Sequence, residues 1–121
     1  MIKFQDKNAA RRQRAKRTYD IHGSAAKPRL TVYRSLTHVY AQLVDDDAGV
    51  TLVAVNTLQD AVAKTIKGKS KKEAAFAVGE ALAKAALAKK IKECVFDRNG
   101  YVYTGRVQQV ADGARKGGLK F

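Results

Sequence analysis

The sequence is short of cysteine, proline and acidic residues, and it has no long apolar run. A single cysteine among 121 residues excludes an internal disulfide framework and a zinc site built from several cysteines. No apolar stretch approaches the roughly 20 residues that a membrane-spanning helix needs, and the first residues lack the apolar segment of a secretory signal. We therefore expect a soluble cytoplasmic protein that has no membrane partner.

Acidic residues are outnumbered by basic ones, and the imbalance is uneven along the chain. The sequence has 11 Asp and Glu against 24 Lys and Arg, a formal net charge of +13 at pH 7. Positions 1–30 hold nine basic and two acidic residues, positions 31–67 hold three and four, and positions 68–121 hold twelve and five. Charge gathered in a segment with almost no large apolar side chains cannot serve a core. Its expected counterpart is a polyanion, and nucleic acid is the first candidate.

The length suits one ordinary domain preceded by a basic arm, residues 1–27. The arm has fair helix propensity but no useful apolar stripe, so we expect it to be flexible alone and to order, partly as a helix, against a partner. It ends at Lys27–Pro28, because the residue before a proline is driven towards extended geometry. Residues 28–121 then form a single α/β domain.

The first part of that domain has the period-two alternation of half-buried strands. The predicted strands are 29–34, 38–44 and 50–55, joined by short loops at 35–37 and 45–49. Loops of this length predict an antiparallel meander. The outward face of the first two strands has no acidic residue and carries Arg29, Thr31, Tyr33, His38, Tyr40 and Gln42.

The second part has helical periodicity. Residues 58–66 are a short helical candidate, and Ser70-x-x-Glu73 is a capping box that opens an amphipathic helix. The inward stripe of this helix is predicted to be Phe76, Gly79, Leu82, Ala83, Ala86 and Leu87, with Gly79 allowing close approach to the sheet.

A short buried strand at 94–96 follows, parallel to an earlier strand because a helix makes the crossover, and a last helix spans about 106–116. The inward residues of that last helix are predicted to be Val107, Val110, Ala111 and Ala114. The order β-β-β-α-β-α predicts an α/β sandwich whose helices cover one face of the sheet.

The arm and the outward sheet face are the candidate binding surfaces. Lys and Arg neutralise phosphates and release counterions, and the rings of Tyr33, His38 and Tyr40 can stack on unpaired bases. Plainer interpretations remain open: exposed tyrosines favour strands in any case, and a basic tail can be merely solvated or a localisation signal. Ser70, with Lys69, Lys71 and Lys72, presents a helix N-terminus suited to a phosphate.

The case for an enzyme is thin. His22 lies in the arm, and His38 lies in a hairpin with no acidic residue nearby in the sequence. Cys94 has apolar neighbours, which favours a buried thiol over a nucleophile. The run 45–47 of three aspartates is explained more simply by a turn than by a cation site. We expect no catalytic residue, metal, cofactor or small-molecule substrate.

Two separated stretches, 33–42 and 96–107 with its continuation at 111–121, resemble the family of bacterial large-subunit ribosomal protein eighteen. The first reads YRSLTHVYAQ, and the second begins FDRNGYVYTGRV and closes with GLKF. The similarity spans essentially the whole chain, including the basic arm. It implies a structural protein of the large ribosomal subunit with a ribonuclease-H-like topology. Such a protein binds 5S ribosomal RNA, helps attach it to 23S ribosomal RNA in the central protuberance, and assembles with ribosomal proteins five and twenty-five.

The resemblance also implies which residues contact RNA. In the arm they are Arg11, Arg12, Arg14, Lys16 and Arg17, to which we add the neighbouring Lys7 and Lys27. On the hairpin and sheet they are Arg29, Arg34, Ser35, Thr37, His38, Tyr40 and Gln42, to which we add Thr31. A secondary patch comprises Arg98, Tyr103 and Arg106.

The chain departs from the family at two positions. Thr104 stands where the family commonly has histidine, which weakens any claim for a contact there. Gly113 replaces a common alanine, which is expected to soften the last helix by up to ~1 kcal/mol.

Two other functions compete with a ribosomal one. A general nucleic-acid binder would hold unrelated duplexes equally well. A nuclease is suggested only by the topology, and two-metal cleavage needs several carboxylates at strand ends. The predicted strands 29–34, 38–44 and 50–55 contain none, so fold analogy transfers no activity.

Overall fold

The period-two and helical patterns of the sequence correspond to a four-stranded sheet and a layer of helices in the computed structural model, which describes residues 7–15 and 21–121. The elements in chain order are α1 (Lys7–Ala15), β1 (Arg29–Arg34), β2 (Val39–Asp45), β3 (Val50–Asn56), α2 (Asp60–Ile66), α3 (Lys71–Ala88), β4 (Val95–Asp97) and α4 (Gly105–Lys116). Within the described ranges, no helix combines the length and apolarity needed to cross a bilayer.

The sheet has the strand order β3-β2-β1-β4. β1 pairs antiparallel with β2, and β2 pairs antiparallel with β3 with an irregularity between Leu43 and Val44. β4 joins the other edge of β1 in parallel, with Leu30 opposite Phe96. The predicted meander and the parallel strand carried by a helical crossover are therefore confirmed.

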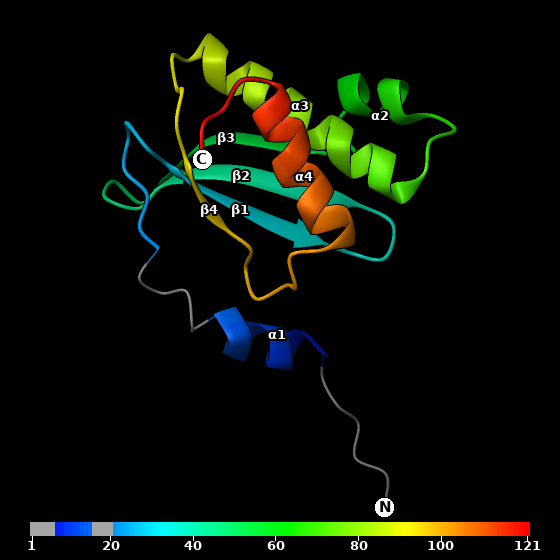
Figure 1. The fold of residues 1–121 in the computed structure, drawn as a ribbon, viewed down its shortest axis with the longest axis horizontal. Helices are drawn as coiled ribbons and strands as arrows, with labels where there is room; N and C mark the ends of the chain where they lie inside the picture. The colour runs from blue at the N-terminus through cyan, green and yellow to red at the C-terminus, as the bar shows by residue number, and fades with distance from the viewer. Residues whose placement is uncertain (1–6, 16–20) are drawn as a thin grey trace, which may run out of the picture.

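One face of the sheet is buried under α3 and α4 (Figure 1). The alternation predicted for the strands is confirmed there. The buried apolar strand residues are Leu30, Val32, Val39, Ala41, Leu43, Val53 and Val55. The inward residues predicted for α4, which include Val107 and Val110, are also buried.

Helix α3 begins as predicted, but its buried stripe differs from the prediction. The side chain of Ser70 accepts a hydrogen bond of 3.3 Å from the backbone N–H of Glu73, which confirms the N-cap. Ala75 and Val78 are fully buried, whereas Phe76 is only half-buried and Leu87 is exposed. The prediction assumed a single partner, but α3 packs against both the sheet and α4. The second partner turns the buried stripe away from Phe76 and Leu87.

Two glycines let α3 and α4 meet through their backbones. A Cβ built on Gly79 would overlap the carbonyl oxygen of Val110, and one built on Gly113 would overlap the carbonyl oxygen of Phe76. Gly79 therefore faces α4, which corrects the prediction that it allows close approach to the sheet. Gly113 has the reciprocal position on α4.

The described part of the predicted arm contacts the body in two places. Helix α1 lies on the side of the sheet opposite α3 and α4 (Figure 1). Gly23 is buried and exchanges hydrogen bonds with Asp46, through its N–H at 2.8 Å and its carbonyl at 3.0 Å. Residues 1–6 and 16–20 of the predicted arm lie outside the described residues, so its flexibility stays a prediction.

Candidate nucleic-acid interface

The outward face of β1 and β2 carries the aromatic pair predicted to stack on bases. Tyr33 lies directly opposite Tyr40 in the β1–β2 register, and their ring centroids are 5.9 Å apart at a tilt of 48°. Tyr33 is 40% exposed, and Tyr40 is half-buried. Cross-strand ring pairs of this kind stabilise the sheet. The pair supports the sheet and leaves part of Tyr33 open to a ligand.

At one end of the same face, Arg29 forms an ion-pair network with two carboxylates. Its Nε and Nη2 donate to the two carboxylate oxygens of Asp46 at 2.9 and 3.1 Å, and its Nη1 donates to Asp97 Oδ2 at 2.9 Å. The hydrogen bond from Arg29, aided by the Gly23 N–H, lowers the pKa of Asp46. The same bond to Asp46 raises the pKa of Arg29. The prediction of a face without acid is wrong at this end, because the two carboxylates come from a turn and from β4.

The hairpin between β1 and β2 is held in shape at its base. The backbone N–H of Ser35 donates to the carbonyl of His38 at 2.9 Å, and the N–H of His38 donates to Ser35 Oγ at 3.1 Å. His38 Nδ1 lies 2.9 Å from Thr57 Oγ1, which fixes the imidazole ring. Leu36, at the tip, is 85% exposed. Hydrogen bonds thus hold the base of the hairpin, and the apolar side chain of Leu36 is exposed at its tip.

Arg34 and Arg106 lie together beside this hairpin, and we call them the arginine pair. Arg34 stacks over the Tyr101 ring at 4.9 Å, and Arg106 Nη1 donates to the carbonyl of Ser35 at 2.9 Å. Burial, followed by the charge of Arg34, lowers the pKa of Arg106. Among the residues that the structure describes, neither guanidinium forms an ion pair with a carboxylate. Two adjacent cations without an acid favour a bound anion.

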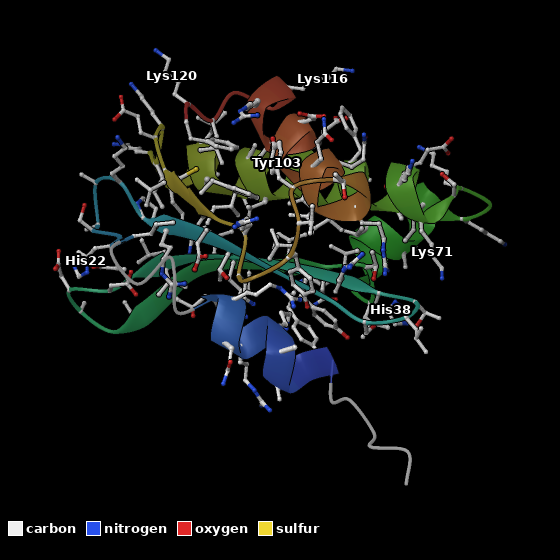
Figure 2. All side chains as sticks on the ribbon, turned by 60° about the horizontal axis from the view of Figure 1, so that its bottom comes forward. His22, His38, Lys71, Tyr103, Lys116 and Lys120 are labelled. Atoms are coloured by element: carbon white, nitrogen blue, oxygen red, sulfur yellow. The ribbon has the colours of Figure 1, made fainter. Side chains whose placement is uncertain are left out.

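A narrow cleft links the hairpin to the start of α3. Its volume is about 120 Å³. Its polar lining residues are Thr37, Thr57, Lys69, Ser70, Lys71 and Arg106. Figure 2 shows Lys71 and His38 at the same end of the molecule, with His22 at the opposite end. The structure therefore brings together the predicted hairpin residues, the predicted helix N-terminus and Arg106, which are distant in the sequence.

The residues of the predicted secondary patch contact different parts of the body. The Tyr103 hydroxyl accepts a hydrogen bond of 3.0 Å from Arg115, and its ring packs edge-on against Phe96 at 5.6 Å. Arg106 instead belongs with Arg34, as described above. Arg98 is half-buried in the turn after β4. Tyr103 and Arg106 thus bond to different partners, Arg115 and Ser35, and the three residues of the predicted patch do not form one cluster.

Sequence reasoning missed Tyr101 as part of this surface. Tyr101 is only 7% exposed, and its hydroxyl bonds to both the N–H and the carbonyl of Arg34, at 3.2 and 3.3 Å. Tyr101 directly follows Asn99–Gly100, a dipeptide typical of turns. The only signal was therefore an aromatic residue after a strong turn, which does not reveal its partner in β1.

The side chains set aside as structural are confirmed in those roles. Cys94 is fully buried, and burial raises the pKa of its thiol to about 12. Asp45 accepts from the backbone N–H groups of Asp47 and Ala48 at 3.1 and 3.3 Å, so its carboxylate builds the predicted turn. Asp47 lies 2.6 Å from His22 Nε2.

Comparison with known proteins finds one family along nearly the whole chain. The family model described as ribosomal L18 of archaea, bacteria, mitochondria and chloroplast matches residues 5–121. Large ribosomal subunit protein uL18 of Alkaliphilus metalliredigens is 48% identical over 122 residues, and that of Clostridioides difficile is 51% identical over 122 residues, each covering 100% of both chains. The uL18 protein of Anaeromyxobacter sp. is 54% identical over 110 residues, 91% of this chain and 92% of its own.

Proposed function

Since the chain belongs to the ribosomal L18 family, and so is a large-subunit ribosomal protein of translation and not an enzyme, we propose that it binds 5S ribosomal RNA. In this proposal it also helps attach 5S RNA to 23S ribosomal RNA in the central protuberance, beside ribosomal proteins five and twenty-five. The α/β topology is proposed to be ribonuclease-H-like, with the basic arm as an RNA-binding extension.

The observation that carries the RNA-binding proposal is the contrast between Arg29 and the arginine pair. Arg29 is neutralised by Asp46 and Asp97, whereas Arg34 and Arg106, which both lie at the β1–β2 hairpin, have no carboxylate partner in the described part of the chain. Unpaired adjacent cations repel each other, and a phosphate between them relieves that repulsion through charge-assisted hydrogen bonds. Releasing the counterions of the RNA adds a favourable, salt-dependent term.

The proposed contact surface extends from the arginine pair to both sides. Towards α3 it includes the cleft and the exposed cations at the helix start, where N–H groups and lysines favour a phosphate. Towards α1 it includes the arm and the sheet residues. The further members of the surface are Lys7, Arg12, Lys16, Arg17, Lys27, Thr31, Ser35, Thr37, His38, Tyr40, Gln42, Lys69, Ser70, Lys71, Lys72, Arg98 and Tyr103. In this proposal Arg29 acts chiefly by holding the end of β1.

Competition binding tests the proposal. The protein is mixed with labelled 5S RNA at one fixed salt concentration, and unlabelled competitors are added. We expect 5S RNA to compete at least 100-fold better than a folded RNA of equal length and therefore equal charge. Equal competition by both RNAs would instead support the general nucleic-acid binder, because phosphate contacts alone carry no sequence information.

A further inference from the structure

Helix α1 is fastened to the body through Arg11. The Arg11 guanidinium lies over two rings, 5.4 Å from the Tyr33 centroid and 5.1 Å from the Tyr101 centroid. Its Nη1 donates to the carbonyl of Asn99 at 3.1 Å. Its Nε is buried without a hydrogen-bond partner among the described residues, so the ring faces are what stabilises the charge there. Most of this cation is turned towards the protein.

Gly100 brings the helix and the body into backbone contact. A Cβ built on Gly100 would overlap the carbonyl oxygen of Arg11 and lie 3.0 Å from the backbone nitrogen of Ala15. The carbonyl of Gly100 accepts a hydrogen bond of 3.0 Å from Arg14 Nε. Any residue larger than glycine at this position would have to push α1 away. We call Tyr33, Asn99, Gly100 and Tyr101 the α1 seat.

The α1 seat is itself held firmly by β1 and β4. Asn99 Nδ2 donates to the carbonyl of Val32 at 3.1 Å, and the N–H of Asn99 donates to Asp97 Oδ1 at 2.9 Å. The Tyr101 hydroxyl accepts a hydrogen bond from the backbone N–H of Arg34 and donates one to the carbonyl of Arg34. A helix fixed to this seat therefore has a defined position relative to the arginine pair.

We propose that Arg11 is a positioning residue that fixes α1 on its seat and does not act as a phosphate ligand, whereas the exposed Arg14 bonds to the seat through its Nε. The inference rests on the proposed function, since what Arg11 positions is the remaining cationic surface for RNA. Because α1 is already in place before RNA binds, forming the complex does not carry the entropy cost of ordering this helix. The five cations of residues 11–17 therefore have two different roles, whereas the sequence resemblance implies a single shared role, contact with RNA.

The decisive variant is Gly100→Ala, which removes no charge. Its matched control is Gly49→Ala. Gly100 and Gly49 both have positive φ, +80° and +69°, so alanine strains both turns, but a Cβ on Gly49 meets nothing within 4 Å. Gly49 also lies outside the proposed contact surface. A difference between the two variants therefore reports the loss of α1 docking.

The first measurement uses NMR spectra of the full chain without RNA. We expect nuclear Overhauser contacts between the Arg11 side chain and the Tyr33 and Tyr101 rings in the wild type and in Gly49→Ala. These contacts should be lost in Gly100→Ala, while contacts within the sheet persist. Absence of the contacts in the wild type, or their persistence in Gly100→Ala, would overturn the proposal.

The second measurement is affinity for 5S RNA. We expect Gly100→Ala and Arg11→Lys to bind roughly tenfold more weakly, because lysine keeps the charge but lacks the planar fork that fits the seat. Gly49→Ala should bind as the wild type does. If Arg11→Lys binds normally, Arg11 is a phosphate ligand, and if Gly100→Ala binds normally, docking does not matter. A wild type without preference for 5S RNA would overturn the proposed function, a result distinct from either of these.

Discussion

Gly79 of α3 and Val110 of α4 are in direct backbone contact, with no room for a side chain between the two helices. We predict that Gly79→Ala lowers the free energy of unfolding by about 1–3 kcal/mol through overpacking, although alanine favours a helix by about 1 kcal/mol. Urea unfolding measures the change. The neighbouring exposed variant Glu80→Ala should stay within about 0.5 kcal/mol of the wild type. Stabilisation by Gly79→Ala would mean that the helices are farther apart than described.

The ion pair between Arg29 and Asp46 should give stability that depends on pH. The pKa of Asp46 is lowered from its ordinary value of 3.8, so its contribution is present above that pH and is lost as pH falls through the lower folded value. Asp46→Asn should therefore destabilise the protein by about 1 kcal/mol at pH 7 and by progressively less below pH 4. Urea unfolding between pH 7 and 3 measures this difference. A penalty that does not change with pH would assign the effect to something other than the carboxylate charge.

The arginine pair should account for part of the salt dependence of RNA binding. Arg34→Ala and Arg106→Ala are each expected to weaken 5S RNA binding and to lower the slope of log affinity against log salt by about one unit. Lys84→Ala is the control, because it removes the same charge from an exposed position on α3 that lies outside the proposed contact surface. Equal effects of all three variants would show that only total charge matters.

The Cys94 thiol should be inert in the folded protein. It is fully buried, and burial raises its pKa to about 12, so almost no thiolate exists at pH 8. We expect no reaction with a thiol reagent at pH 8 until urea unfolds the chain, followed by one equivalent of labelling. Reaction of the native protein at the rate of a free thiol would contradict the described burial.

The sequence was sufficient for the features that depend on neighbouring residues. Alternation predicted β1–β3, the short loops predicted the meander, and Ser70 with Glu73 predicted the start of α3. A helical crossover predicted that β4 is parallel to an earlier strand, and the structure shows that this strand is β1. Each of these follows from local periodicity or from the length of a connection.

The features that the sequence did not predict depend on residues brought together from distant positions. Arg29 meets Asp46 and Asp97 only because β1 lies between β2 and β4. The contact of Arg11 with Tyr101 likewise needs the turn after β4 to reach α1. For the candidate site, residue type therefore predicted which side chains suit RNA, whereas the sequence could not show which of them are already engaged within the protein.

Hydrogen–deuterium exchange of the full chain, with and without 5S RNA, tests the central claim most directly. We predict that RNA slows exchange in α1, in the hairpin at 34–38 and at the start of α3, and leaves the outer surface of α3 around the exposed Glu80 and Lys84 unchanged. Slower exchange on the outer surface of α3, with the hairpin and α1 unaffected, would show that RNA binds elsewhere and would contradict the proposed interface.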